Sequence, residues 1–126
     1  MDSLVMAIQR CKDLEVYNLS FEMAIEIFDE TRKFPKEEVY SLTDQIRRSS
    51  RSIPANIREG FAKRKYPDVF LRHLNDALGS SEETMTWLEF AYRASYLTKE
   101  KYEKFSKKYE HVSAMLYKLM QNWHKT

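Results

Sequence analysis

The sequence is poor in the residues that make turns and cross-links. Its 126 residues include 2 Gly, 3 Pro and 1 Cys. A β-sheet protein of this length would normally need more Gly and Pro for its turns, so their scarcity favours helices. The single cysteine, Cys11, leaves no internal disulfide, which fits a reducing cytoplasm.

Long apolar runs are also missing. Residues Met1 to Arg10 lack the apolar stretch of a secretory signal peptide. No segment approaches the roughly 20 apolar residues of a transmembrane helix. We therefore expect a cytoplasmic protein that has no membrane partner.

No pattern in the chain indicates catalysis or metal binding. The three histidines, His73, His111 and His124, have no histidine four residues away and no cysteine nearby, and no Glu-x-x-His motif occurs. No serine or cysteine stands in a nucleophile motif, and no glycine-rich phosphate loop is present. The sequence predicts a protein that is not an enzyme and that holds no metal and no cofactor.

What the chain does contain is enough apolar material for one packed core. Hydrophobic residues make up 43% of it and charged residues 32%, and its 2 Trp, 8 Tyr and 7 Phe argue against disorder. This length favours a single domain over residues 1–126. Residues 1–13 precede the first helical pattern, and we expect them to be flexible or loosely packed.

Two helices are predicted in the first half of the chain. The first runs from about Val16 to Lys33 and ends at Phe34-Pro35, because the residue before a proline leaves the α region. Its expected core stripe, at heptad-like spacing, is Tyr17, Phe21, Ala24, Phe28 and Thr31. The second begins near Lys36 and ends near Gly60. Its apolar stripe is Val39, Leu42, Ile46, Ser50, Ile53 and Ile57.

Pro54 lies inside the second helical pattern. A proline within a helix removes one hydrogen bond and clashes with the preceding turn. The apolar stripe keeps its phase across Pro54, so we interpret the segment as one kinked helix. The alternative is a break at Ser52-Ile53.

Two more helices are predicted in the second half. One starts near Pro67, a favoured first helical residue, and runs to about Ser95. Its main seam is Phe70, Leu74, Ala77, Ser81, Thr84, Leu88 and Ala91. The last helix opens at the N-cap Thr98 and carries the most regular heptad pattern in the chain. Short connections make neighbouring helices antiparallel, so the fold class is an all-α, up-and-down four-helix bundle.

The third helix has a second apolar stripe. Its members are Leu71, Leu78, Met85 and Tyr92, with Trp87 and Phe90 beyond it. One bundle core cannot cover both stripes, and a helix that is apolar on two faces usually packs on two sides. This surplus predicts self-association.

A row of polar residues follows one face of the second helix. Its members are Gln45, Ser49, Ser52 and Asn56, with Arg48 and Glu59 beside them. The third helix offers Gly79, Ser80 and Glu83. We interpret Gln45, Arg48, Ser52, Asn56, Glu59, Ser80 and Glu83 as a buried structural polar network, in which Arg48 meets Glu83. The alternative is a ligand or partner site.

Positive charge is concentrated in the middle of the chain. Residues 47–73 hold eight basic and two acidic residues, a net +6, so the remaining residues carry −4 of the overall +2. In an up-and-down bundle, the link between the second and third helices lies at the same end as both termini. Phosphate contacts there would bind nucleic acid, and the alternative is an ordinary solvated end.

Several segments of the sequence are similar to a known family. The stretch Gln45-Ile-Arg-Arg-Ser-Ser-Arg-Ser-Ile-Pro-Ala-Asn-Ile-Arg-Glu-Gly60 resembles the pattern of the 23S rRNA intervening-sequence proteins, also called the S23 or four-helix-bundle protein family. Phe34-Pro35 with Glu38, and Gly79-Ser80 with Glu83, match two further motifs. The resemblance covers roughly residues 13–120. One departure is Ser81, which stands where the family commonly has Leu.

The resemblance implies a left-handed four-helix bundle that assembles into a ring-like homopentamer. A related branch includes the accessory protein of diversity-generating retroelements, which binds nucleic acid through a basic surface and partners a reverse transcriptase. For most members of the family the function is unknown.

Two functions follow as expectations. The first is an oligomeric protein that binds RNA or DNA with little sequence preference. The residues expected to contact the nucleic acid are Arg47, Arg51, Arg58, Lys63, Arg64, Lys65 and Arg72. The second is an interaction module that scaffolds a protein partner, such as a reverse transcriptase, without touching nucleic acid.

Overall fold

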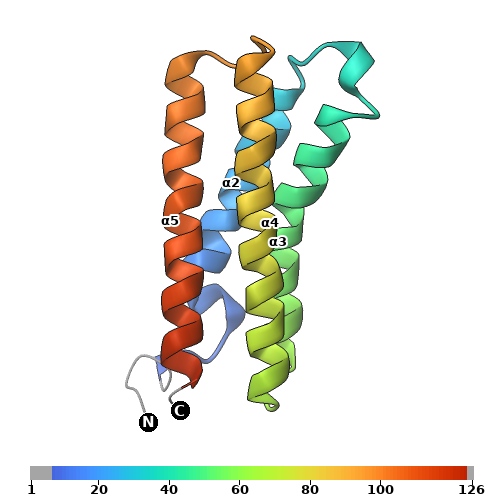
Figure 1. Ribbon diagram of the computed structural model, residues 1–126. Coiled ribbons are helices and arrows are strands. Elements are labelled where there is room, and N and C mark those ends of the chain that lie inside the picture. The colour runs from blue at the N-terminus through green and yellow to red at the C-terminus, as the bar shows by residue number, and fades with distance from the viewer. Residues whose placement is uncertain (1–6, 125–126) are drawn as a thin grey trace.

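Four long helices run alternately up and down in the computed structural model, which describes residues 7–124 without the side chain of His124 (Figure 1). They are α2 (Glu15–Thr31), α3 (Leu42–Ala62), α4 (Pro67–Arg93) and α5 (Lys99–His124). Two short 3₁₀ turns, η1 (Cys11–Asp13) and η2 (Lys36–Glu38), precede α2 and α3. Residues 7–124 contain no β-strand, so the chain is an all-α four-helix bundle, as the sequence predicts. The left-handed arrangement of the four helices, which the resemblance implies, stays a prediction.

Each helix packs on its neighbour in sequence, and α2 closes the bundle against α5. Ion pairs support this last contact: Lys101 Nζ lies 2.9 Å from Glu30 Oε1, and Lys104 and Lys108 both approach Glu26. The α3–α4 link lies at the same end of the bundle as the start of α2 and the end of α5 (Figure 1). The basic residues near that link therefore share one end of the molecule.

The main core is built from the predicted seams. Every member of the α4 seam is buried, and so are the regularly spaced apolar residues of α5 from position 105 to 123. The predicted stripe of the second helix is buried within α3, whereas its first member, Val39, precedes the helix and is 47% exposed. Ser81 is fully buried within this core because its hydroxyl donates to the Tyr109 carbonyl at 3.2 Å and lies 2.8 Å from Ser113 Oγ. Satisfied in this way, a serine can occupy a core position at little cost.

The second helix begins later than predicted. Residues from Lys36 to Glu38 form a separate 3₁₀ turn, and the α-helix starts only at Leu42. The Glu38 carboxylate accepts a hydrogen bond from the Leu42 N–H at 3.2 Å and another from the Tyr96 hydroxyl at 2.8 Å, which ties this turn to the link between α4 and α5. The interpretation of one helix through Pro54 is confirmed, because α3 is continuous from Leu42 to Ala62.

The predicted core stripe of the first helix is right at its two ends and wrong between them: Tyr17 and Thr31 are buried, whereas Ala24 and Phe28 are only half-buried. The fully buried residues of α2 are Ser20, Met23 and Ile27, whereas the Phe21 side chain is 46% exposed. Ile25, also on the outside, is 44% exposed. Both faces of this helix are apolar, and the face that meets the other three helices takes the core.

Two further expectations about packing need correction. Cys11 and Leu14 are buried, and η1 packs on α2 and α3, so residues 11–13 are not a loose segment. Residues 1–6 of that segment lie outside the described residues. The second stripe of α4 is also half-covered, because Leu71, Leu78 and Met85 pack against the core. Among the described residues, the large apolar side chains that stay exposed on the helices are Phe21 and Ile25 on α2, Phe90 on α4 and Tyr117 on α5.

Candidate functional site

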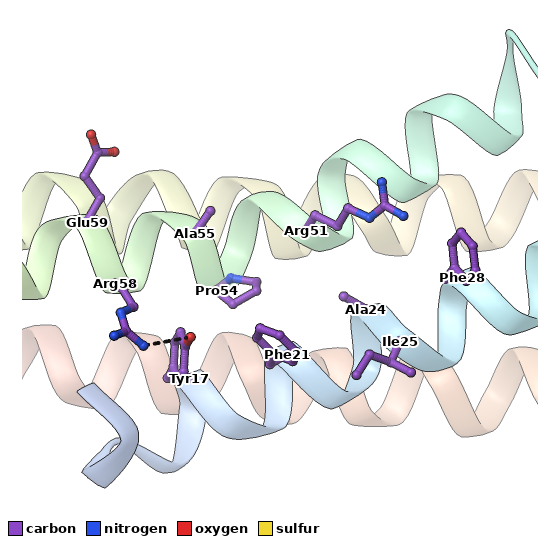
Figure 2. A pocket seen from close by; sticks show the side chains of 10 residues that line it. All are labelled: Tyr17, Phe21, Ala24, Ile25, Phe28, Arg51, Pro54, Ala55, Arg58 and Glu59. Atoms are coloured by element: carbon purple, nitrogen blue, oxygen red, sulfur yellow. Dashed lines mark hydrogen bonds between the residues drawn. The ribbon is translucent and has the colours of Figure 1, made fainter. Parts of the chain in front are cut away.

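An apolar groove runs between α2 and α3, with a volume of about 670 Å³ (Figure 2). Its walls are formed by Phe21, Ala24 and Ile25 on α2 and by Pro54 and Ala55 on α3. The small side chains at 54 and 55 form a low wall opposite the exposed ring of Phe21. A groove with this lining can hold apolar or aromatic side chains from outside the chain.

Arginines surround one end of this groove. The guanidinium carbons of Arg32, Arg47 and Arg51 lie 4.8, 4.5 and 5.4 Å from the centroid of the Phe28 ring. Arg47 is held further by a 2.8 Å hydrogen bond from its Nε to Thr31 Oγ1. Desolvation lowers the pKa of Arg47, and the positive charges of Arg51 and Arg32 lower it further. Three cations around one ring repel one another and favour an external anion.

Arg58 lies along the same groove, two helical turns after Arg51. Its Nη1 donates to the Tyr17 hydroxyl at 3.4 Å, and this contact raises the pKa of Arg58 (Figure 2). No ion pair among residues 7–124 includes Arg51 or Arg58. Glu59 also lines the groove, but its carboxylate pairs with Lys63 at 3.5 Å and lies 3.8 Å from His73. The groove is therefore apolar at its centre and positive along its α3 side.

A second basic surface lies at the end of the bundle that holds the α3–α4 link. A hollow of about 440 Å³ brings Arg10 and Lys12, from the N-terminal segment, beside Arg58. The sequence pattern does not reveal Arg10 and Lys12, because they reach this surface only through the fold of the N-terminal segment. Burial raises the pKa of the Cys11 thiol in this hollow, which disfavours the reactive thiolate.

The predicted basic residues of the α3–α4 link differ in whether their side chains contact other groups of the chain. Lys65 and Arg72 are exposed and have no ion pair within the described part of the chain. Arg64 instead folds back: its guanidinium lies 4.0 Å from the Phe61 ring centroid and donates to the Phe61 carbonyl at 3.1 Å. Arg64 therefore stabilises the end of α3. We call the exposed set the basic end, and its members are Arg10, Lys12, Lys63, Lys65, Arg72 and Lys118.

Part of the predicted polar network connects α3 to α4. Ser52 Oγ lies 2.9 Å from Ser80 Oγ, and the Asn56 amide donates to Ser52 Oγ at 3.1 Å. His73 Nδ1 lies 3.2 Å from Asn56 Oδ1. These groups are half-buried and have partners within the chain, so their geometry fits a structural contact between the two helices.

The other half of the network is not buried. Arg48 does not meet Glu83: its Nε pairs with Asp44 on the same helix at 3.1 Å, and its side chain is 77% exposed. Glu83 accepts a 2.9 Å hydrogen bond from Trp87 Nε1 and is exposed, as are Gln45 and Glu59. Partners on their own helices let these charges stay in water, which avoids the cost of burying them. The prediction that these four residues are buried is wrong.

The described residues form neither a metal-binding cluster nor a membrane-spanning helix. Within them, no group of three or more His, Cys, Asp or Glu side chains is placed to hold a metal ion. None of their helices is both long enough and apolar enough to cross a bilayer. What the residues do define is a class: an antiparallel four-helix bundle with an apolar, arginine-lined groove and a basic end.

Comparison with known proteins places this bundle in a family. The chain belongs to the 23S rRNA-intervening sequence protein family, whose model matches residues 12–118. It is also similar to a solved structure, a protein of unknown function from the S23 ribosomal protein family of Bacteroides thetaiotaomicron. The two sequences are 31% identical, and the match covers 84% of this chain and 95% of that chain with a TM-score of 0.76. No curated protein is similar enough to count as a relative.

Proposed function

We propose that this chain is a non-catalytic, self-associating protein that binds RNA or DNA through its basic end, with little sequence preference. The observation that carries the proposal is the group of exposed cations at that end, of which Lys12, Lys65, Arg72 and Lys118 have no ion pair among residues 7–124. Unpaired surface cations are the groups that release counterions when phosphates bind.

The local structure of the basic end supports contact with the nucleic-acid backbone. Residues 63–66 form the short link between two helices, so Lys63 and Lys65 project from the bundle without helical neighbours on both sides. Tyr66 is 62% exposed beside Lys65, whose Nζ lies 5.9 Å from its ring, and an exposed ring there can stack on an unpaired base. No groove-reading motif accompanies these residues, so we expect phosphate contacts to dominate.

A filter-binding titration tests this proposal. The test variant is Lys65→Glu/Arg72→Glu, and the probes are a structured RNA and a DNA duplex of unrelated sequences. We expect affinity for both probes to fall at least tenfold, because four units of charge change where phosphates would lie. The control, Lys36→Glu/Lys99→Glu, changes the net charge equally at the opposite end and should bind like the wild type.

Stability must be checked in parallel. All four substituted residues are exposed, so the free energy of unfolding of each variant should lie within about 0.5 kcal/mol of the wild-type value. If the wild-type protein binds neither probe at low salt, the proposed nucleic-acid function is wrong. Equal losses in test and control variants would show that only net charge matters, and not the basic end.

A second candidate function is a scaffold for a protein partner that binds no nucleic acid. The α2–α3 groove favours it, because Phe21 and Ile25 expose apolar surface that phosphates do not need. Under this function the titration fails for the wild type while a partner, such as a reverse transcriptase, binds the groove.

A further inference from the structure

Two properties of the α2–α3 groove indicate that it binds another surface. Phe21 and Ile25 are 46% and 44% exposed, so their apolar surface remains in contact with water. Arg51 and Arg58 stand beside that surface, and no ion pair within residues 7–124 includes either of them. An occupant that matches both properties presents carboxylates on either side of a flat or recessed apolar region.

The outward stripe of α4 presents such a surface. Asp76, Gly79, Glu83 and Phe90 are all exposed and repeat at helical spacing, so they lie on one line along the helix. Neither Asp76 nor Glu83 has an ion pair in the described part of the chain. Phe90, 58% exposed, adds apolar surface two turns beyond Glu83.

Gly79 makes this stripe unusual. It stands within a 27-residue helix, where glycine is less favourable than alanine. A Cβ added at Gly79 would meet nothing within 4 Å, so no group of this chain needs the space that the missing side chain leaves. A group from outside the chain can use that space, because a glycine lets another surface approach the helix backbone closely.

We propose that the α2–α3 groove of one copy binds the α4 stripe of a second copy, with Arg51 and Arg58 facing Asp76 and Glu83. This inference rests on the proposed self-association and names the surfaces that carry it. The two arginines are seven residues apart and so are the two acids; at 1.5 Å per residue, both pairs span about 10.5 Å along their helices. Gly79 lies between the acids, opposite the exposed Phe21.

The geometry of such a contact has a consequence for the assembly. The groove and the stripe are different surfaces of the same chain, so the contact is heterologous, and each bound copy still offers one free groove or stripe. Contacts of this kind continue until they close into a ring or extend as a filament. A closed ring would carry the basic ends of all its subunits on one rim.

Charge reversal tests the pairing of the two surfaces. The groove variant is Arg51→Glu/Arg58→Glu and the stripe variant is Asp76→Arg/Glu83→Arg. In each variant the groove and the stripe carry charges of the same sign and repel each other. Sedimentation at micromolar concentration should therefore show monomers. The variant with all four substitutions carries both surfaces with reversed signs and should regain the wild-type size. A control, Lys36→Glu/Lys107→Glu, changes two exposed charges that lie on neither surface and should sediment like the wild type.

A steric variant tests the same contact without a change of charge. Gly79→Gln places a long side chain in the space above α4 and suits a helix, so the fold should persist, as checked by circular dichroism. We expect the dissociation constant for self-association to rise at least tenfold.

The outcomes separate the interface from the proposed function. A wild-type protein that is monomeric at micromolar concentration overturns self-association and this interface together. A wild-type oligomer with unaffected groove and stripe variants, or a folded four-substitution variant that stays monomeric, overturns only the interface. A groove variant that keeps its size but loses RNA binding would assign the groove to nucleic acid instead.

Discussion

At the scale of single residues, Tyr109 is the clearest unsatisfied group in the core. Its side chain is fully buried, and its hydroxyl has no hydrogen-bond partner among residues 7–124. A buried hydroxyl that loses its bonds to water and gains none costs about 1–3 kcal/mol. Burial, and to a lesser degree the charge of Glu26, raises the pKa of Tyr109 above its ordinary value.

We expect Tyr109→Phe to leave stability unchanged or to increase it by about 1 kcal/mol, because the ring keeps its packing and the lone hydroxyl is removed.

The raised pKa of Tyr109 also makes the stability of the fold depend on pH. An acid whose folded-state pKa is raised stabilises the fold below its ordinary pKa of about 10 and loses that contribution as pH rises above it. Denaturant unfolding at pH 8 and pH 10.5 should therefore show a smaller alkaline loss in Tyr109→Phe than in the wild type. An equal loss in both would assign the alkaline sensitivity to other groups.

At the scale of helices, Gly60 fixes how closely α3 approaches α4. A Cβ at this position would lie 2.5 Å from His73 Cβ and 3.1 Å from the Phe70 ring. Both neighbours belong to a packed helix, so neither can move away freely. The contact needs glycine because no larger residue fits between the two backbones.

Gly60→Ala should therefore destabilise the protein by about 1–3 kcal/mol, the usual cost of overpacking a core. Gly79→Ala is the matched control, since its Cβ meets nothing, and it should stabilise the monomer by about 0.5–1 kcal/mol. Chemical denaturation at concentrations too low for self-association measures both. Similar effects from the two substitutions would mean that helix propensity, and not the close approach to α4, decides the cost at position 60.

The sequence predicts the helices and the buried seams of α3, α4 and α5 because the apolar residues of these three helices follow a single period. The pattern fails for α2, where two apolar faces compete and only the neighbouring helices decide which one is buried. Phe21 and Ile25 lie on the face of α2 that stays outside the core, and they form one wall of a groove that periodicity alone does not reveal.

The polar row shows a different limit of the sequence pattern. Spacing places Arg48 and Ser52 on the same side of one helix, but it does not say where a long side chain ends. Ser52 is short and meets Ser80 across the helix contact, whereas Arg48 reaches water and pairs with Asp44. Likewise, Arg10 and Lys12 join the basic end only through the fold of the N-terminal segment.

At the scale of the whole molecule, the groove and the basic end have separate roles. Assembly through the groove and the α4 stripe leaves the basic end free. In a ring, identical basic ends face the same side, so a long nucleic acid can contact several subunits at once. The affinity of the assembly then depends on the number of subunits, even though each basic end binds weakly.

The salt dependence of binding should reveal this multiplication. Each phosphate contact contributes about −0.7 to −0.9 to the slope of log affinity against log salt. The assembly-deficient variant Gly79→Gln keeps every residue of the basic end. At a concentration where this variant is monomeric and the wild type is assembled, each monomer should make the same contacts as one subunit of the ring. With a long RNA, we therefore expect Gly79→Gln to bind more weakly and with a slope reduced by at least half. With an RNA too short to reach a second subunit, the variant and the wild type should show the same slope. A long-RNA slope that is unchanged in the monomeric variant would mean that nucleic acid engages only one subunit, and the ring would then serve some purpose other than binding strength.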